Sequence, residues 1–133
     1  MKYSKSVSII LLSILLSLLI SCAGLRSKTD AQEEFDLGLS FFNRGKYEEA
    51  ILHFEKATEF NPEFGQPYLY IGRSYVNLGK WREAISPLRT AYRLAPEETK
   101  KEIADILTDL LLKNATKLDK DTQSQVEELL RQK

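Results

Sequence analysis

The chain has 133 residues, 43% of them hydrophobic, and its 19 basic and 19 acidic side chains give a formal net charge of zero. This length fits one small domain. The single cysteine excludes a fold held by internal disulfide bonds, and the balanced charge argues against a nucleic-acid-binding protein with a broad basic surface.

The N-terminal 21 residues have the pattern of a secretory signal peptide. Lys2 and Lys5 precede Val7–Ile20, a run of fourteen residues that contains only Val, Ile, Leu and Ser. A permanent transmembrane helix needs about 20 apolar residues, whereas the core of a signal peptide is shorter. We therefore predict a signal peptide over residues 1–21.

The end of this apolar run, Leu19-Ile20-Ser21-Cys22, resembles the lipobox of bacterial lipoproteins. The resemblance implies cleavage before Cys22, attachment of diacylglycerol to its sulfur and acylation of the new amino terminus. More than one acyl chain would hold the protein firmly at a membrane that it does not span. The alternatives are an ordinary signal peptide that happens to precede a cysteine, and a short anchor that is not removed.

Residues 22–29 are mostly polar, and we expect them to form a lipidated tether to a domain over residues 30–133. Without residues 1–21 the chain has 17 basic and 19 acidic side chains, so charge alone gives no attraction to anionic lipid or nucleic acid. Ala23 stands where some bacteria use an aspartate to retain lipoproteins in the inner membrane. This position favours the outer membrane of a bacterial cell envelope.

The remaining chain contains an internal repeat. Residues 31–64 and 65–98 match at twelve of thirty-four positions, and the best match places Gly45–Ile51 over Gly79–Ile85. In the first copy, Leu37, Gly38 and Phe41 recur at helical spacing, and so do Ala50, Phe54 and Ala57. We expect each copy to be a pair of helices that bury these faces.

This pattern resembles the tetratricopeptide repeat, a helix pair of about 34 residues with small and large residues at fixed positions. Pro62 and Pro96 match the family's proline, whereas Glu34 departs from the large aromatic residue that Tyr68 supplies in the second copy. The resemblance implies an all-α fold: a short right-handed superhelix of three antiparallel helix pairs. Residues 99–133 would form the third, capping pair, with helices near 97–113 and around Val126–Leu130.

Local signals add detail to the predicted helices. Asn43–Lys46 and Asn77–Lys80 each contain a glycine that can end a helix. Pro62 and Pro96, each followed by Glu, suit the first turn of a helix. Pro87 falls inside a predicted helix, where we expect a local kink.

No set of residues indicates catalysis, a cofactor or a metal. His53 has no Cys or second His to complete a metal site, and we expect it on the solvated surface. The acidic pairs are adjacent in sequence, which spreads them around a helix instead of bringing them together in a cleft. We therefore do not expect an enzyme.

The first helix of each pair carries a second apolar stripe, at positions that line a protein-binding groove in the tetratricopeptide family. The resemblance implies these candidate contact residues: Phe35, Leu39, Phe42, Asn43, Leu69, Tyr70, Arg73, Val76 and Asn77. An apolar groove with one arginine suits an amphipathic helix or an extended apolar peptide. The alternative is that Phe35, Leu39 and Phe42 are buried inside the chain or against a second copy.

The sequence thus favours a tetratricopeptide-like lipoprotein that binds protein partners at the bacterial cell envelope as an adaptor or scaffold. The alternative function is a self-assembling structural lipoprotein, whose apolar groove forms a homo-oligomer interface.

Overall fold

The computed structural model describes the backbone of residues 3–114, 116 and 118–131, and the side chains of residues 9–14, 28–114, 116 and 118–131. Over these residues all the regular secondary structure is α-helix, which confirms the all-α part of the predicted fold class. The described helices are α1 (Tyr3–Asn43), α2 (Tyr47–Phe60), α3 (Gly65–Asn77), α4 (Trp81–Leu94), α5 (Glu97–Asn114) and α6 (Lys120–Arg131).

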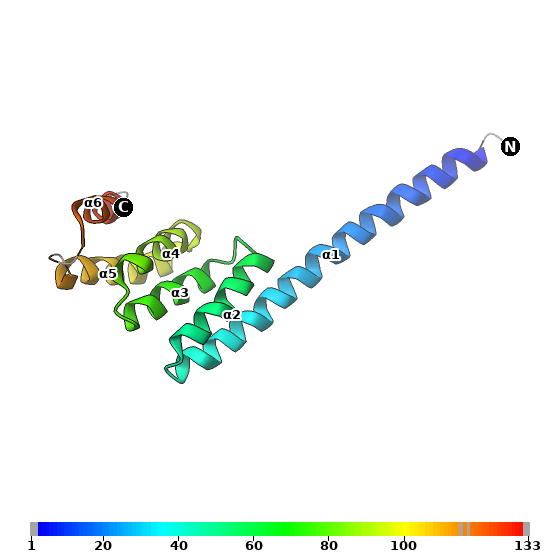
Figure 1. Ribbon diagram of the computed structural model, residues 1–133. Helices are drawn as coiled ribbons and strands as arrows, with labels where there is room; N and C mark the ends of the chain where they lie inside the picture. The colour runs from blue at the N-terminus through cyan, green and yellow to red at the C-terminus, as the bar shows by residue number, and fades with distance from the viewer. Residues whose placement is uncertain (1–2, 115, 117, 132–133) are drawn as a thin grey trace.

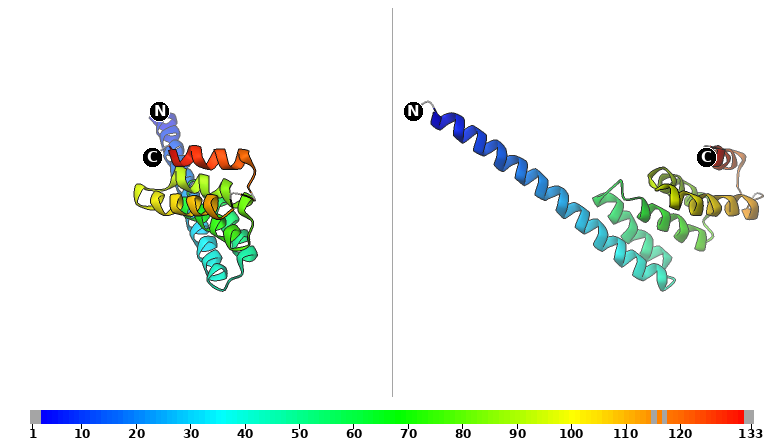
Figure 2. Two further views of the ribbon diagram at one scale, coloured as in Figure 1. Left: turned by 90° about the vertical axis from the view of Figure 1, so that its left-hand side faces the viewer. Right: turned by 180° about the vertical axis from the view of Figure 1, so that it is seen from behind.

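Each helix packs mainly on its neighbours along the chain, and α6 also contacts α4. The C-terminal part of α1 lies against α2, while its N-terminal part projects from the bundle as a single rod (Figure 1). Seen from the end, the helices from α2 to α6 form a stack with α6 on its outer side (Figure 2). Nearest-neighbour packing of this kind is expected when each helix pair must bury its apolar face on the next pair.

The turns inside the first two helix pairs follow the sequence signals closely. Gly45 and Gly79 have φ angles of 72° and 70°, in the left-handed region that favours glycine. The amide of Lys46 donates to the carbonyl of Phe41 at 3.0 Å, and the amide of Lys80 donates to that of Tyr75 at 2.9 Å. The same turn therefore closes both pairs.

Two helical glycines bring the partner helices into close contact. A Cβ atom on Gly38 would lie 2.5 Å from the ring of Phe54, and one on Gly72 would lie 2.5 Å from Cγ of Leu88. Phe54 and Leu88 occupy equivalent positions in α2 and α4, and both are fully buried. The two hairpins therefore repeat one packing design.

Two apolar clusters form the core. The first joins α1, α2 and α3 through Phe35, Phe54 and Ile71. The second joins the four helices α3, α4, α5 and α6 through residues such as Leu88 and Leu107. The half-buried side chain of Tyr75 packs against both clusters. Its burial, together with the nearby carboxylates of Glu55 and Glu83, raises the pKa of the Tyr75 hydroxyl.

Leu37 differs from the expectation that it lies on a buried face, because 48% of its surface is exposed. Its counterpart in the second copy, Ile71, is only 6% exposed because it packs against residues of α2. Among the described residues no helix covers the corresponding side of α1. The position in the stack, and not the residue type, therefore decides the burial of this site.

One of the prolines does not lie where the sequence predicted. Pro62 lies in the turn before α3, which begins only at Gly65, whereas Pro96 directly precedes α5 and its carbonyl accepts from the amides of Thr99 and Lys100. Pro67, not Pro62, occupies the first turn of α3. Pro87 lies inside α4, which continues through it as one helix.

The N-terminal predictions fall largely outside what the structure describes. The side chain of Cys22 is not among the described residues, nor are those of residues 3–8 and 15–27. The backbone of residues 22–29 is helical and belongs to α1. Within the described part of the chain, no helix has both the length and the apolar character needed to cross a membrane.

Candidate protein-binding groove

The structure divides the nine candidate contact residues into buried and accessible ones. Phe35 and Leu69 are each 5% exposed and belong to the two core clusters. The half-buried ones are Leu39, Phe42, Tyr70, Arg73 and Val76, and the exposed ones are Asn43 and Asn77. In this conformation Phe35 and Leu69 cannot contact a partner, so the alternative of burial inside the chain holds for Phe35.

An aromatic cluster explains the burial of Phe35. Its ring centroid lies 5.6 Å from that of Phe54, 5.1 Å from that of Phe64 and 5.6 Å from that of Tyr70. These rings come from α1, α2, α3 and the turn before α3. Tilted and edge-to-face contacts of this kind stabilise an aromatic core beyond simple burial. Phe35 therefore joins the first two helix pairs.

Arg73 connects three helices on the accessible side of this cluster. Its guanidinium lies 5.8 Å from the ring centroid of Phe42 on α1 and 5.3 Å from that of Tyr70 on α3. Its Nη1 donates to Oε1 of Glu102 on α5 at 3.1 Å. The only cation among the candidate residues is thus neutralised within the chain.

Beyond Arg73, an open groove of about 600 Å³ lies between α3 and α5. Three apolar side chains line it: Val76 from α3 and Ile106 and Leu110 from α5. All three belong to the apolar core or pack against it, which fixes their positions. The groove therefore includes Arg73, Val76 and Asn77 of the predicted set and adds a wall from α5.

That wall is acidic, which the sequence analysis missed. Glu98, Glu102, Asp105 and Asp109 all line the groove. Their spacing of four, three and four residues puts them on one face of a helix. The sequence prediction considered only adjacent acids such as Glu97-Glu98. The longer spacing is also present in the sequence and would have predicted this acidic face.

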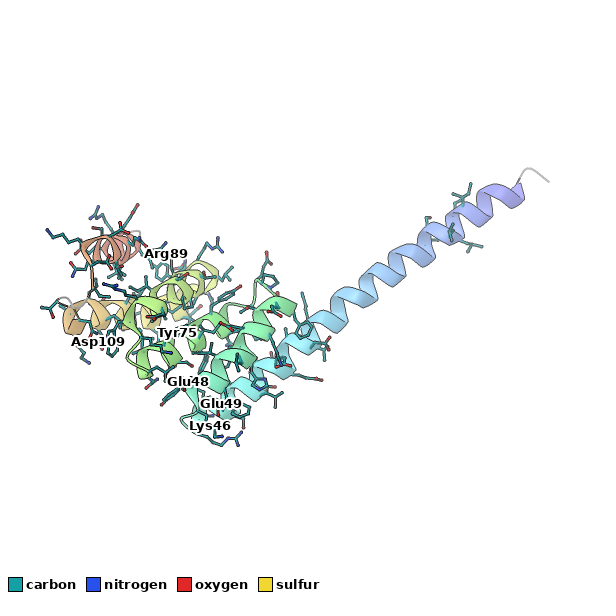
Figure 3. All side chains as sticks on the ribbon, in the orientation of Figure 1. Lys46, Glu48, Glu49, Tyr75, Arg89 and Asp109 are labelled. Carbon is teal, nitrogen blue, oxygen red and sulfur yellow. The ribbon has the colours of Figure 1, made fainter. Side chains whose placement is uncertain are left out.

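A second hollow of about 910 Å³ lies between α4, α5 and α6 and has a different character. Among its lining residues are Arg89, Arg93, Lys100 and Lys101, with Glu97 and Glu128 as the acids. Arg89 donates to Gln125 of α6, and the Glu97 carboxylate, which accepts from Lys100 at 2.5 Å, raises the pKa of that ammonium. Figure 3 shows Arg89 near α6 and Asp109 on α5.

His53 is not the freely solvated residue that we expected. It stacks on Phe41 with ring centroids 5.0 Å apart, and its Nδ1 donates to Oε2 of Glu34 at 2.7 Å. Its side chain is 23% exposed. Glu34 therefore ties α1 to α2 through this histidine. Within the described residues no three His, Cys, Asp or Glu side chains are grouped to hold a metal ion.

Comparison with protein families adds an independent result. A family model described as Regulator of microtubule dynamics protein 1-3 matches residues 41–132, which is more than half of the chain. The chain belongs to this family. The matched residues run from the end of α1 through α6 and include every residue that lines the groove between α3 and α5. No curated protein matches the chain.

Proposed function

We propose that the chain is a protein-binding adaptor of the tetratricopeptide type, held at a bacterial membrane by lipid on Cys22. The observation on which the proposal depends is the groove between α3 and α5, which combines apolar lining residues with an accessible polar edge. A groove of this kind between helices suits an inserted peptide or helix. The proposal assigns no catalytic activity to the chain.

The repeated hairpin supports the tetratricopeptide assignment. Gly38 against Phe54 and Gly72 against Leu88 are the same close contact in two successive pairs, and each pair closes with a glycine of positive φ. In that family the first helices of the pairs bind the partner. Arg73, Val76 and Asn77 belong to such a first helix and line the groove.

The lipid anchor rests on the sequence around Cys22, and the helical backbone after it adds a consequence. From residue 22 to Ala31, the first buried one among the described side chains of α1, the helix rises about 14 Å at 1.5 Å per residue. The proposed anchor would thus hold the helical domain at the membrane surface and raise the effective concentration of its groove for partners there.

The family description names microtubule dynamics, but the proposal takes from the family a helical fold and not that partner. Because of the lipobox-like segment, we propose that the protein acts at a bacterial cell envelope, at the outer membrane in preference to the inner.

Self-assembly is the second candidate function. It is favoured by the exposure of Leu37 on the uncovered side of α1, where a second copy could pack.

Site-specific crosslinking in intact cells tests the proposal. A photoreactive residue in place of Asn77 reports on the groove, and one in place of Glu59 on α2 is the matched exposed control. We expect discrete heterologous adducts from position 77 that are absent from position 59. Equal labelling from both positions, or none from position 77, would contradict a binding role of the groove. Adducts of two identical chains would support self-assembly.

A further inference from the structure

The lining of the groove between α3 and α5 contains more acidic than basic side chains. Its lining contains four carboxylates, from Glu98, Glu102, Asp105 and Asp109, but only two cations, Arg73 and Lys101. Arg73 is bound to Glu102 at 3.1 Å, and Lys113, outside the groove, is 2.9 Å from Asp109. Glu98, Lys101 and Asp105 make no ion pair with any residue that the structure describes, so the unpaired charged groups of the lining are two carboxylates and one ammonium.

We propose that the occupant of this groove is a basic amphipathic helix of another protein. Apolar side chains of the helix would contact the half-buried Val76 and Ile106, and its Lys or Arg side chains would face Glu98 and Asp105. This inference rests on the proposed binding role of the groove and adds the chemistry of the partner. Opposite charges at the rim of an interface select the partner and speed its association.

The apolar and acidic residues of the groove lie side by side, and this arrangement favours a basic amphipathic helix as the ligand. The apolar residues lie beside the acidic face of α5, since Ile106 follows Asp105 and Leu110 follows Asp109. A ligand must therefore offer an apolar stripe and a basic stripe side by side, which an amphipathic helix does. An acidic ligand would meet the carboxylates after Arg73 is already neutralised by Glu102.

A second copy of the chain does not offer such a helix among the described elements. The most basic candidate is α4, with Arg82, Arg89 and Arg93, but its apolar residues Ile85 and Leu88 are buried in the core. The described helices thus favour a different polypeptide as the partner.

Peptide photo-crosslinking to the full chain in non-ionic detergent tests this inference. The probe is a helical peptide of Leu and Lys about fourteen residues (four turns) long, with apolar and basic faces and a photoreactive residue on the apolar face. A second peptide has Glu in place of every Lys. Adducts mapped by mass spectrometry show where a peptide binds the protein. Each peptide is compared between the parent chain and its variants in the same detergent, so that association of the peptide with micelles affects both measurements equally.

We expect the basic peptide to label α3 and α5, and the acidic peptide to label them much less. Asp105→Lys should lower the yield with the basic peptide roughly tenfold and raise it with the acidic peptide. The matched control Glu59→Lys, an equal charge reversal on exposed α2, should leave both yields unchanged. Asp105 is exposed, so its substitution should not impair folding, and circular dichroism verifies this.

The outcomes separate this inference from the proposed function. Preferential labelling of the groove by the acidic peptide would overturn the basic partner and leave the groove as a binding site. The same conclusion follows if neither peptide labels the groove while position 77 still captures a partner in cells. Failure of both experiments overturns both proposals, and adducts between two chains at α3 and α5 would make a second copy the occupant.

Discussion

At the scale of single residues, two glycines set the distance between paired helices. Glycine inside a helix costs about 1 kcal/mol relative to alanine, so its use at the same place in both repeats needs a compensating reason. The contacts of Gly38 with Phe54 and of Gly72 with Leu88 supply that reason, because neither partner side chain has any solvent-exposed surface. A methyl group at either glycine would have to displace a packed core residue.

We predict that Gly72→Ala destabilises the protein. The new Cβ would lie 2.5 and 2.6 Å from Cγ and Cδ2 of the fully buried Leu88. Overpacking costs about 1–3 kcal/mol, which should exceed the gain of about 1 kcal/mol in helix propensity. Urea unfolding followed by circular dichroism measures the difference. The exposed control Gln66→Ala should change the free energy of unfolding by less than about 0.5 kcal/mol. A variant as stable as the parent would refute the close-packing argument.

At the scale of helices, α6 is held by its N-terminal cap and by a few core contacts. Oδ1 of Asp119 accepts from the Thr122 amide at 2.9 Å, and Oδ2 accepts from the Thr122 hydroxyl at 3.0 Å. These hydrogen bonds, with a smaller effect from Arg82, lower the pKa of Asp119 below its ordinary value of 3.8. Val126 is the buried residue that fixes the helix to the core.

We predict that α6 frays when Asp119 loses its charge or its side chain. A carboxyl whose pKa is lower in the folded state stabilises that state above the ordinary pKa, and this stabilisation is lost as the pH falls through the lowered pKa. Hydrogen-exchange protection of the Thr122 and Gln123 amides, which donate to Asp119, should therefore decrease under acidic conditions, and Asp119→Ala should reduce it at every pH.

The matched control is Asp119→Asn, which keeps an acceptor for the Thr122 amide but cannot ionise. Its protection should change less over the same acidic range than that of the parent chain. An identical pH response in both proteins would show that another group, and not Asp119, controls the end of α6.

One helix boundary, the start of α3, differs from the prediction. Local spacing predicted the two Gly turns because a left-handed residue is a local requirement. It misplaced the start of α3, since Asn61 forms its own turn: its carbonyl accepts from the Phe64 amide and its side chain from the Glu63 amide. Competition of this kind between a side chain and the backbone is not visible in hydrophobic periodicity.

At the scale of the whole molecule, the proposal joins a membrane anchor to a stack of helices. If Cys22 carries lipid, Cys22→Ser should move the protein from the detergent phase to the aqueous phase and abolish lipid labelling, because the acyl chains provide the affinity for the membrane. Phase partitioning and metabolic labelling with a fatty acid measure the two effects. Substitution of the neighbouring Ser21 by Ala, another small residue, is the control and should leave both unchanged. Unchanged partitioning of Cys22→Ser would contradict the lipid anchor.

The sequence by itself determined the all-α fold, the two similar hairpins and their glycine turns. Each of these depends on short-range spacing, which residues a few positions apart in the chain reveal directly. The candidate groove was only partly predictable: Arg73, Val76 and Asn77 line it, but the α5 wall with Glu98 and Asp105 did not appear among the predicted contacts.

Tertiary structure alone decided which apolar side chains are buried. Phe35 enters a four-ring cluster, whereas Leu37, two residues later, is 48% exposed although its repeat counterpart Ile71 is buried. The difference arises because a helix face is covered only where another helix packs against it, and Ile71 has α2 beside it while Leu37 has no described helix there. Periodicity identifies an apolar face, but the positions of the neighbouring helices determine whether it becomes core or surface.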